Sequence, residues 1–86
     1  MLRRQPNTRE GMHSLQIAMV SIVASELRKD MPAQLEREVE IAEERAKDPP
    51  KGVWPKAEFL ANLGPEPFFK ALQHFEALDM AVRAAA

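Results

Sequence analysis

The side chains best suited to catalysis are few in this chain. His13 and His74 are the only histidines, and neither cysteine nor tyrosine occurs. Ser14 follows His13 directly, and a serine beside a basic imidazole is the pairing that nucleophilic catalysis uses. Neighbouring residues of a helix point about 100° apart, however, so these two side chains cannot pair in helical backbone. We therefore predict no catalytic residue and no enzymatic activity.

Metal and cofactor sites lack suitable ligands as well. Thiolate ligands are excluded because the chain has no cysteine, and its two histidines stand far apart, at positions 13 and 74. The three glycines do not form the glycine-rich loop that binds phosphate groups. We expect no metal site, no cofactor and no cofactor-binding residue.

The composition is that of one small helical domain. With 86 residues and a net charge of −1, the chain can bury one limited core and offers no excess positive charge to nucleic acid. Helix-favouring residues are frequent, and no stretch alternates as a β-strand does. So small a domain without disulfides commonly gains stability by association, and the lack of cysteine fits a reducing compartment. We predict a single all-α, cytoplasmic domain that forms a homodimer.

Residues 12–27 are the longest apolar stretch, and Glu26 is its only charge. At helical spacing its apolar residues fall into two stripes. The first stripe is Met12, Leu15, Met19, Ile22 and Val23, and the second is Ile17, Val20, Ala24 and Leu27. The stretch is shorter than the ~18–20 apolar residues of a membrane span and contains polar side chains, so we expect no membrane contact.

A helix that is apolar on two sides has to be covered on two sides. Either later helices of the same chain cover both stripes, or one stripe is an interface with a second copy or another protein. On the second interpretation, the predicted partner-binding residues of this helix are Met19, Val20, Val23 and Leu27.

Residues 32–47 predict a second, strongly amphipathic helix. Asp30, Met31 and Pro32 separate it from the first helix, and so short a link predicts an antiparallel hairpin. Its outer face is acidic, and this face is either a solvated surface or a docking site for a partner. The residues assigned to that site are Glu36, Glu40, Glu43 and Glu44.

The stretch 48–55, with the sequence DPPKGVWP, predicts a loop because its prolines exclude regular structure. It contains the only tryptophan, Trp54. This side chain is either a lid over the core or an exposed anchor for a partner, since tryptophan is enriched at interface hot spots. Trp54 is therefore included among the predicted partner-binding residues.

The remaining chain predicts a short helix over 55–63 and a longer one over 66–83, separated by Gly64 and Pro65. Together with helices over about 12–29 and 32–47, they form the expected domain, residues 12–86. The residues expected in or near its core are Trp54, Phe59, Phe68, Phe75, Leu15, Ile22 and Leu35.

Residues 1–11 are predicted to be a flexible basic arm, with Arg3, Arg4 and Arg9 against Glu10. A helix that begins near Thr8 is the alternative, because Asn7 and Glu10 have capping-box spacing. A basic arm contacts phosphate groups, which makes a small dimeric DNA-binding transcriptional regulator the alternative function.

The fold expected from these patterns is a small bundle of three to four helices with an N-terminal antiparallel helical hairpin. The expected function is a non-enzymatic interaction module that binds a larger protein partner, as an inhibitor, an antitoxin or a chaperone-like regulator does. Its apolar helix face and its acidic helix are the expected contacts, and nucleic acid is not an expected partner.

Overall fold

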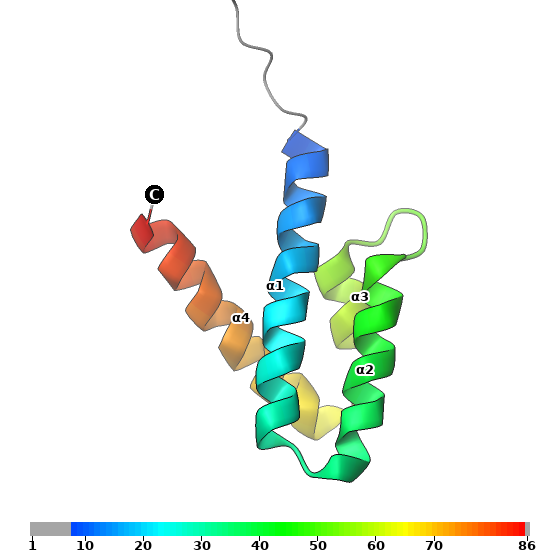
Figure 1. Ribbon diagram of the computed structural model, residues 1–86. Helices are drawn as coiled ribbons and strands as arrows, with labels where there is room; N and C mark the ends of the chain where they lie inside the picture. Colours follow the sequence, from blue (N-terminus) through cyan, green and yellow to red (C-terminus); the bar gives the residue numbers. More distant parts are fainter. Residues whose placement is uncertain (1–7, 86) are drawn as a thin grey trace, which may run out of the picture.

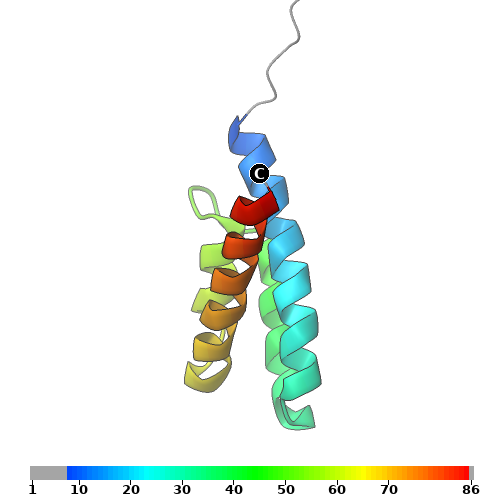
Figure 2. The ribbon, with the colours of Figure 1, turned by 90° about the vertical axis from the view of Figure 1, so that its left-hand side faces the viewer.

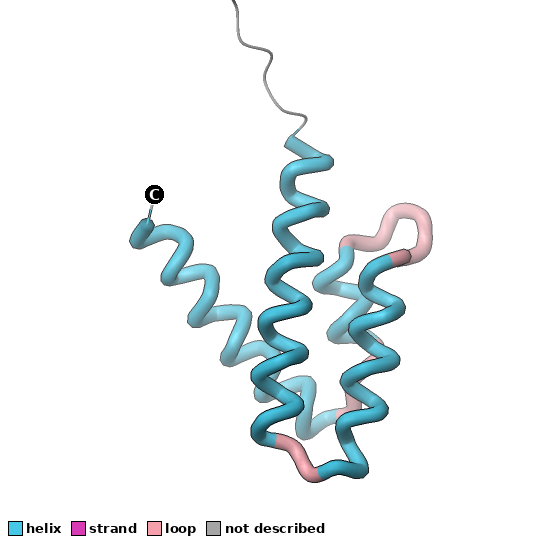
Figure 3. Tube along the Cα trace, in the orientation of Figure 1, coloured by secondary structure: helices cyan, strands magenta, loops and turns pink. Residues whose placement is uncertain are grey.

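The computed structural model describes residues 8–85 as four helices and, over that range, no strand (Figures 1 and 3). The helices are α1 (Thr8–Asp30), α2 (Ala33–Lys47), α3 (Pro55–Ala61) and α4 (Pro65–Ala85). The prediction of a small all-α bundle is confirmed.

Helices α1 and α2 form the expected antiparallel hairpin and lie side by side in Figure 1. The chain reverses at Met31 and Pro32, where the extended Pro32 (φ −61°, ψ 154°) precedes the first residue of α2. A salt bridge of 2.8 Å between Arg28 and Glu43 joins the two helices. Proline starts a helix readily and cannot continue one, so the turn follows from the sequence.

Helix α1 begins at Thr8, the alternative to the predicted start at Met12, so residues 8–11 belong to the helix and not to the predicted arm. Glu10 in the first turn is favoured by the helix dipole, and Arg9 contacts Trp54. These contributions offset the roughly 1 kcal/mol cost of Gly11 within a helix. Residues 1–7 of the predicted arm lie outside the described residues.

The core lies where α1, α2 and α3 meet and is closed by the first half of α4. Phe59 and Phe75 are fully buried and meet edge to face, with their ring centres 6.0 Å apart. Leu35 is half-buried against the same cluster. The core positions predicted for these three residues are confirmed.

Three other residues expected in the core are exposed instead. Leu15 is 40% exposed, Ile22 is 48% exposed and Trp54 is 37% exposed, while Phe68 is half-buried. For the two α1 residues the reason is geometric: the other helices cover one side of α1, and that side takes Met19 and Val23 from the first stripe as well as the second stripe's Val20, Ala24 and Leu27. Leu15 and Ile22 lie on the side of α1 that is less covered.

Side-chain contacts fix both ends of the short helix α3. The Gln16 side chain of α1 accepts a hydrogen bond from the Lys56 backbone near the start of α3. After its end, the Gly64 backbone N–H donates to the Glu38 carboxylate of α2. Beyond this turn α4 diverges from α1, and the two helices are farthest apart at the C-terminal end of α4 (Figure 1). Figure 2 shows the same two helices from the side of α4.

Candidate functional site

Four of the predicted partner-binding residues form part of the core. Met19 is 7% exposed, Val20 is 1% exposed, and Val23 and Leu27 have no exposed surface. The structure corrects their assignment, because they have almost no surface to offer a partner while the chain is folded. Sequence spacing identified α1 as apolar on two sides, but it did not show that these residues, two from each stripe, would be buried within the chain.

The apolar surface that remains open lies on α1 and α4. Outside Trp54, every exposed large hydrophobic residue among those described belongs to one of these two helices. They are Met12, Leu15 and Ile22 on α1, and Phe69, Leu72, Met80 and Val82 on α4. No site was predicted on α4, although Phe69, Leu72 and Met80 recur at intervals that place them on one side of a helix.

The C-terminal end of α4 extends beyond the helices against which the first half of α4 packs. Ala71, Phe75 and Leu78 follow the helical repeat of its packed face, and Val82 continues that repeat one turn later. Ala71 and Phe75 are buried, whereas Val82 is 47% exposed. The apolar repeat on the packed face of α4 therefore continues one turn beyond the part of the helix that the other helices cover.

The open side of α1 is uncharged up to Ser25, beyond which Glu26 and Lys29 form a salt bridge. No Asp, Glu, Lys or Arg occurs between Gly11 and Ser25, and this segment contains Met12, Leu15 and Ile22. A neutral apolar surface can meet another copy of itself without like-charge repulsion. On these grounds α1 is better suited to self-association than the acidic face of α2.

The four predicted glutamates of α2 do gather on one surface. Glu36, Glu40 and Glu44 are exposed, whereas Glu43 is half-buried and bound to Arg28. Together with Arg28 and Lys47, the four line a shallow depression of about 420 Å³. The structure therefore brings these side chains together, with Glu43 already engaged in a salt bridge.

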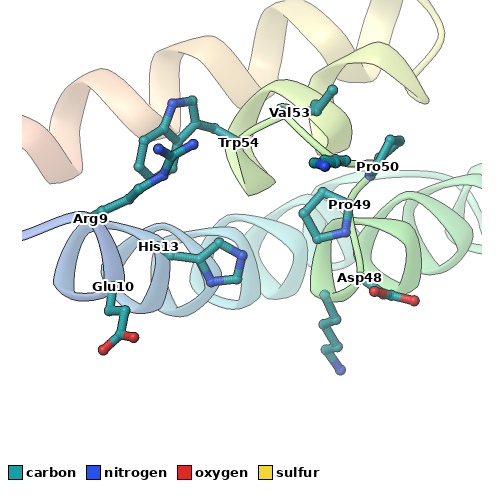
Figure 4. A pocket seen from close by; sticks show the side chains of 11 residues that line it. Arg9, Glu10, His13, Asp48, Pro49, Pro50, Val53 and Trp54 are labelled. Atoms are coloured by element: carbon teal, nitrogen blue, oxygen red, sulfur yellow. The ribbon is translucent and has the colours of Figure 1, made fainter. Parts of the chain in front are cut away.

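A second depression, of about 400 Å³, lies between the first turns of α1 and the loop that joins α2 to α3 (Figure 4). Trp54 forms part of its wall, and the Arg9 guanidinium lies over the indole, 5.9 Å from the ring centre. Trp54 is thus neither a buried lid nor a fully exposed anchor. It forms a partly open aromatic surface beside a cation.

The loop beside Trp54 is stiff. Pro49 and Pro50 restrict its backbone, and the Val53 N–H donates a hydrogen bond to the Pro50 carbonyl at 3.0 Å. Gly52, within this turn, has φ +83°, a conformation that side chains with a Cβ rarely adopt. The wall of the depression is consequently formed before any ligand arrives.

The histidines lie on different helices and have different surroundings. His13 lines the depression beside Trp54, while Nε2 of His74 lies 3.9 Å from a carboxylate oxygen of Asp30. Within the part of the chain that the structure describes, no three His, Asp or Glu side chains are grouped as a metal site would require. None of the described helices combines the length and apolarity needed to cross a membrane.

Comparisons with protein-family models, curated proteins and solved structures gave no match. Function is therefore inferred from this chain's own surfaces. Of the basic residues behind the alternative DNA-binding function, Arg3 and Arg4 lie outside the described residues and Arg9 contacts Trp54. That alternative stays a prediction.

Proposed function

We propose that this chain is a non-enzymatic protein-interaction module that self-associates through the apolar residues exposed on α1 and α4. The observation that carries the proposal is the confinement of exposed large hydrophobic residues to these two helices, Trp54 apart, over residues 9–85. Large exposed apolar side chains are typical of interaction sites where they form a contiguous patch.

A second copy of the chain is the first partner we propose for this surface. The uncharged segment from Gly11 to Ser25 does not repel its own copy, and the exposed apolar side chains of α4 supply further apolar area. Burial of such side chains stabilises association by about 25 cal/mol per Å² of apolar surface, before the entropic cost of binding.

Self-association through α1 and α4 leaves the acidic face of α2 for a larger partner. Exposed Glu36, Glu40 and Glu44 favour a basic protein surface and increase its rate of encounter. In this arrangement the module acts by covering a surface of its partner, as an inhibitor, antitoxin or chaperone-like regulator does.

Light scattering over a dilution series from about 100 to about 1 μM tests the self-association, since mass action makes it depend on concentration. We expect a mass near twice the 9.7 kDa of one chain at the highest concentration. Leu15→Glu and Met80→Glu, at exposed apolar positions, each weaken the dimer about tenfold or more because they bury an unpaired charge.

Ser14→Glu is the matched control, because Ser14 is exposed on the same helix but is not part of either apolar stripe. It should leave the dimer intact. A folded monomer at every concentration would refute self-association. Equal weakening by Ser14→Glu and Leu15→Glu would show that charge on α1, and not the apolar stripe, controls the result.

A further inference from the structure

The depression beside Trp54 is separate from the apolar residues that the proposed self-association uses. It is built from α1 residues Arg9, Glu10 and His13 and from the loop segment 47–54. Its volume of about 400 Å³ is within the usual range of roughly 300–1,000 Å³ for sites that bind small groups. It is large enough for one or two side chains of a bound peptide.

The lining combines cationic groups with an apolar wall. Arg9, Lys47 and Lys51 outnumber the acidic Glu10 and Asp48. Figure 4 shows the carboxylates of Glu10 and Asp48 directed away from the space beside Trp54 and Pro49, whereas the His13 ring points toward it. The apolar part of the wall consists of Pro49, Pro50, Val53 and Trp54.

We propose that this depression binds a short acidic segment of a protein partner. A carboxylate of the segment lies against Arg9 and Lys51, and a neighbouring apolar side chain covers Trp54. Guanidinium and ammonium groups bind carboxylates through charge-assisted hydrogen bonds, and an aromatic wall adds apolar contact. The inference rests on the proposed interaction function in one respect, that the ligand is a protein.

The surroundings favour a short acidic peptide over a nucleic acid. Lys47 lines this depression and also the acidic depression of α2, so the two adjoin. A long polyanion that continued past Lys47 would meet Glu40 and Glu44, whereas a short acidic segment would not.

The Arg9 side chain and the loop, which form the two sides of the depression, are both held in place before a ligand binds. Contact with Trp54 orders the long Arg9 side chain, and the prolines together with the turn at Gly52 order the loop. Binding therefore costs less conformational entropy than it would on a mobile loop.

Trp54 is the only tryptophan, so its fluorescence reports this site alone. The probe is a short capped peptide of alternating glutamate and leucine, compared with a lysine and leucine peptide of equal length. We expect a saturable change with the acidic peptide only, weakened by added salt. Lys51→Ala should raise its Kd about three- to tenfold, whereas Lys29→Ala, at an exposed lysine outside the depression, should not.

Three results would overturn the inference. They are no saturable change up to about 1 mM peptide, equal binding of the lysine peptide, or tighter binding of an oligodeoxythymidylate than of the acidic peptide. The Leu15→Glu variant separates this test from that of self-association. It should weaken the dimer and keep the peptide response, whereas Lys51→Ala should keep the dimer and weaken binding of the peptide.

Discussion

Gln16 of α1 accepts a hydrogen bond from the backbone N–H of Lys56 at 3.0 Å, and in this way α1 caps α3. The first amides of a helix have no acceptor within it. Trp54, at the N-cap of α3, makes no side-chain capping bond, and Pro55 has no N–H to satisfy. A side chain from another helix therefore supplies the missing acceptor to a helix of seven residues, too short to be stable alone.

Gln16→Ala is predicted to lower the free energy of unfolding by about 1 kcal/mol, the usual contribution of a partly buried hydrogen bond. Urea denaturation measures this change. Gln73→Ala is the control, because Gln73 is an exposed glutamine on α4. Equal effects of the two substitutions would show that the bond to Lys56 does not stabilise α3.

Gly64 and Glu38 are predicted to be energetically coupled. A Cβ at Gly64 would lie 2.8 Å from Oε1 of Glu38, so Gly64→Ala displaces the carboxylate and breaks its bond to the Gly64 N–H. We expect Gly64→Ala and Glu38→Ala each to cost about 1–2 kcal/mol.

The two effects should not add. In a Glu38→Ala background, the carboxylate that would clash with a Cβ at residue 64 is absent. Gly64→Ala should then be neutral or slightly stabilising, since alanine restricts the unfolded chain more than glycine does. Urea denaturation of both single variants and the double variant gives the coupling energy. If the two losses of stability simply add in the double variant, the proposed contact between Gly64 and Glu38 is wrong.

A charged side chain is predicted to prevent folding at Val20 but to be tolerated at Leu15. Val20→Glu puts a carboxylate at a position that is 1% exposed and should abolish cooperative unfolding, as followed by circular dichroism. Leu15 is 40% exposed, so Leu15→Glu should retain the fold, with the stability of the single chain changed by only about 0.5 kcal/mol. A folded Val20→Glu protein would place the second stripe of α1 outside the core.

Much of the fold could be predicted because it depends on local chemistry. Pro32 and the Gly64–Pro65 pair end or begin helices whatever surrounds them, and the two-residue link at Met31 and Pro32 imposes the hairpin. The charge pattern of α2 likewise placed four glutamates on one surface. Phe59 and Phe75 were identified as core because large apolar side chains at helical spacing are seldom left exposed.

The sequence by itself determined that α1 has two apolar sides, but only the tertiary structure decided which residues of each are buried: Met19 and Val23 of the first stripe, and Val20 and Leu27 of the second. Periodicity gives the direction in which side chains point and not the helix that they meet. For the same reason the open end of α4 and the depression beside Trp54 were missed. That depression joins residues 9–13 to the distant segment 47–54, and such proximity arises only when the hairpin closes and α3 packs against α1.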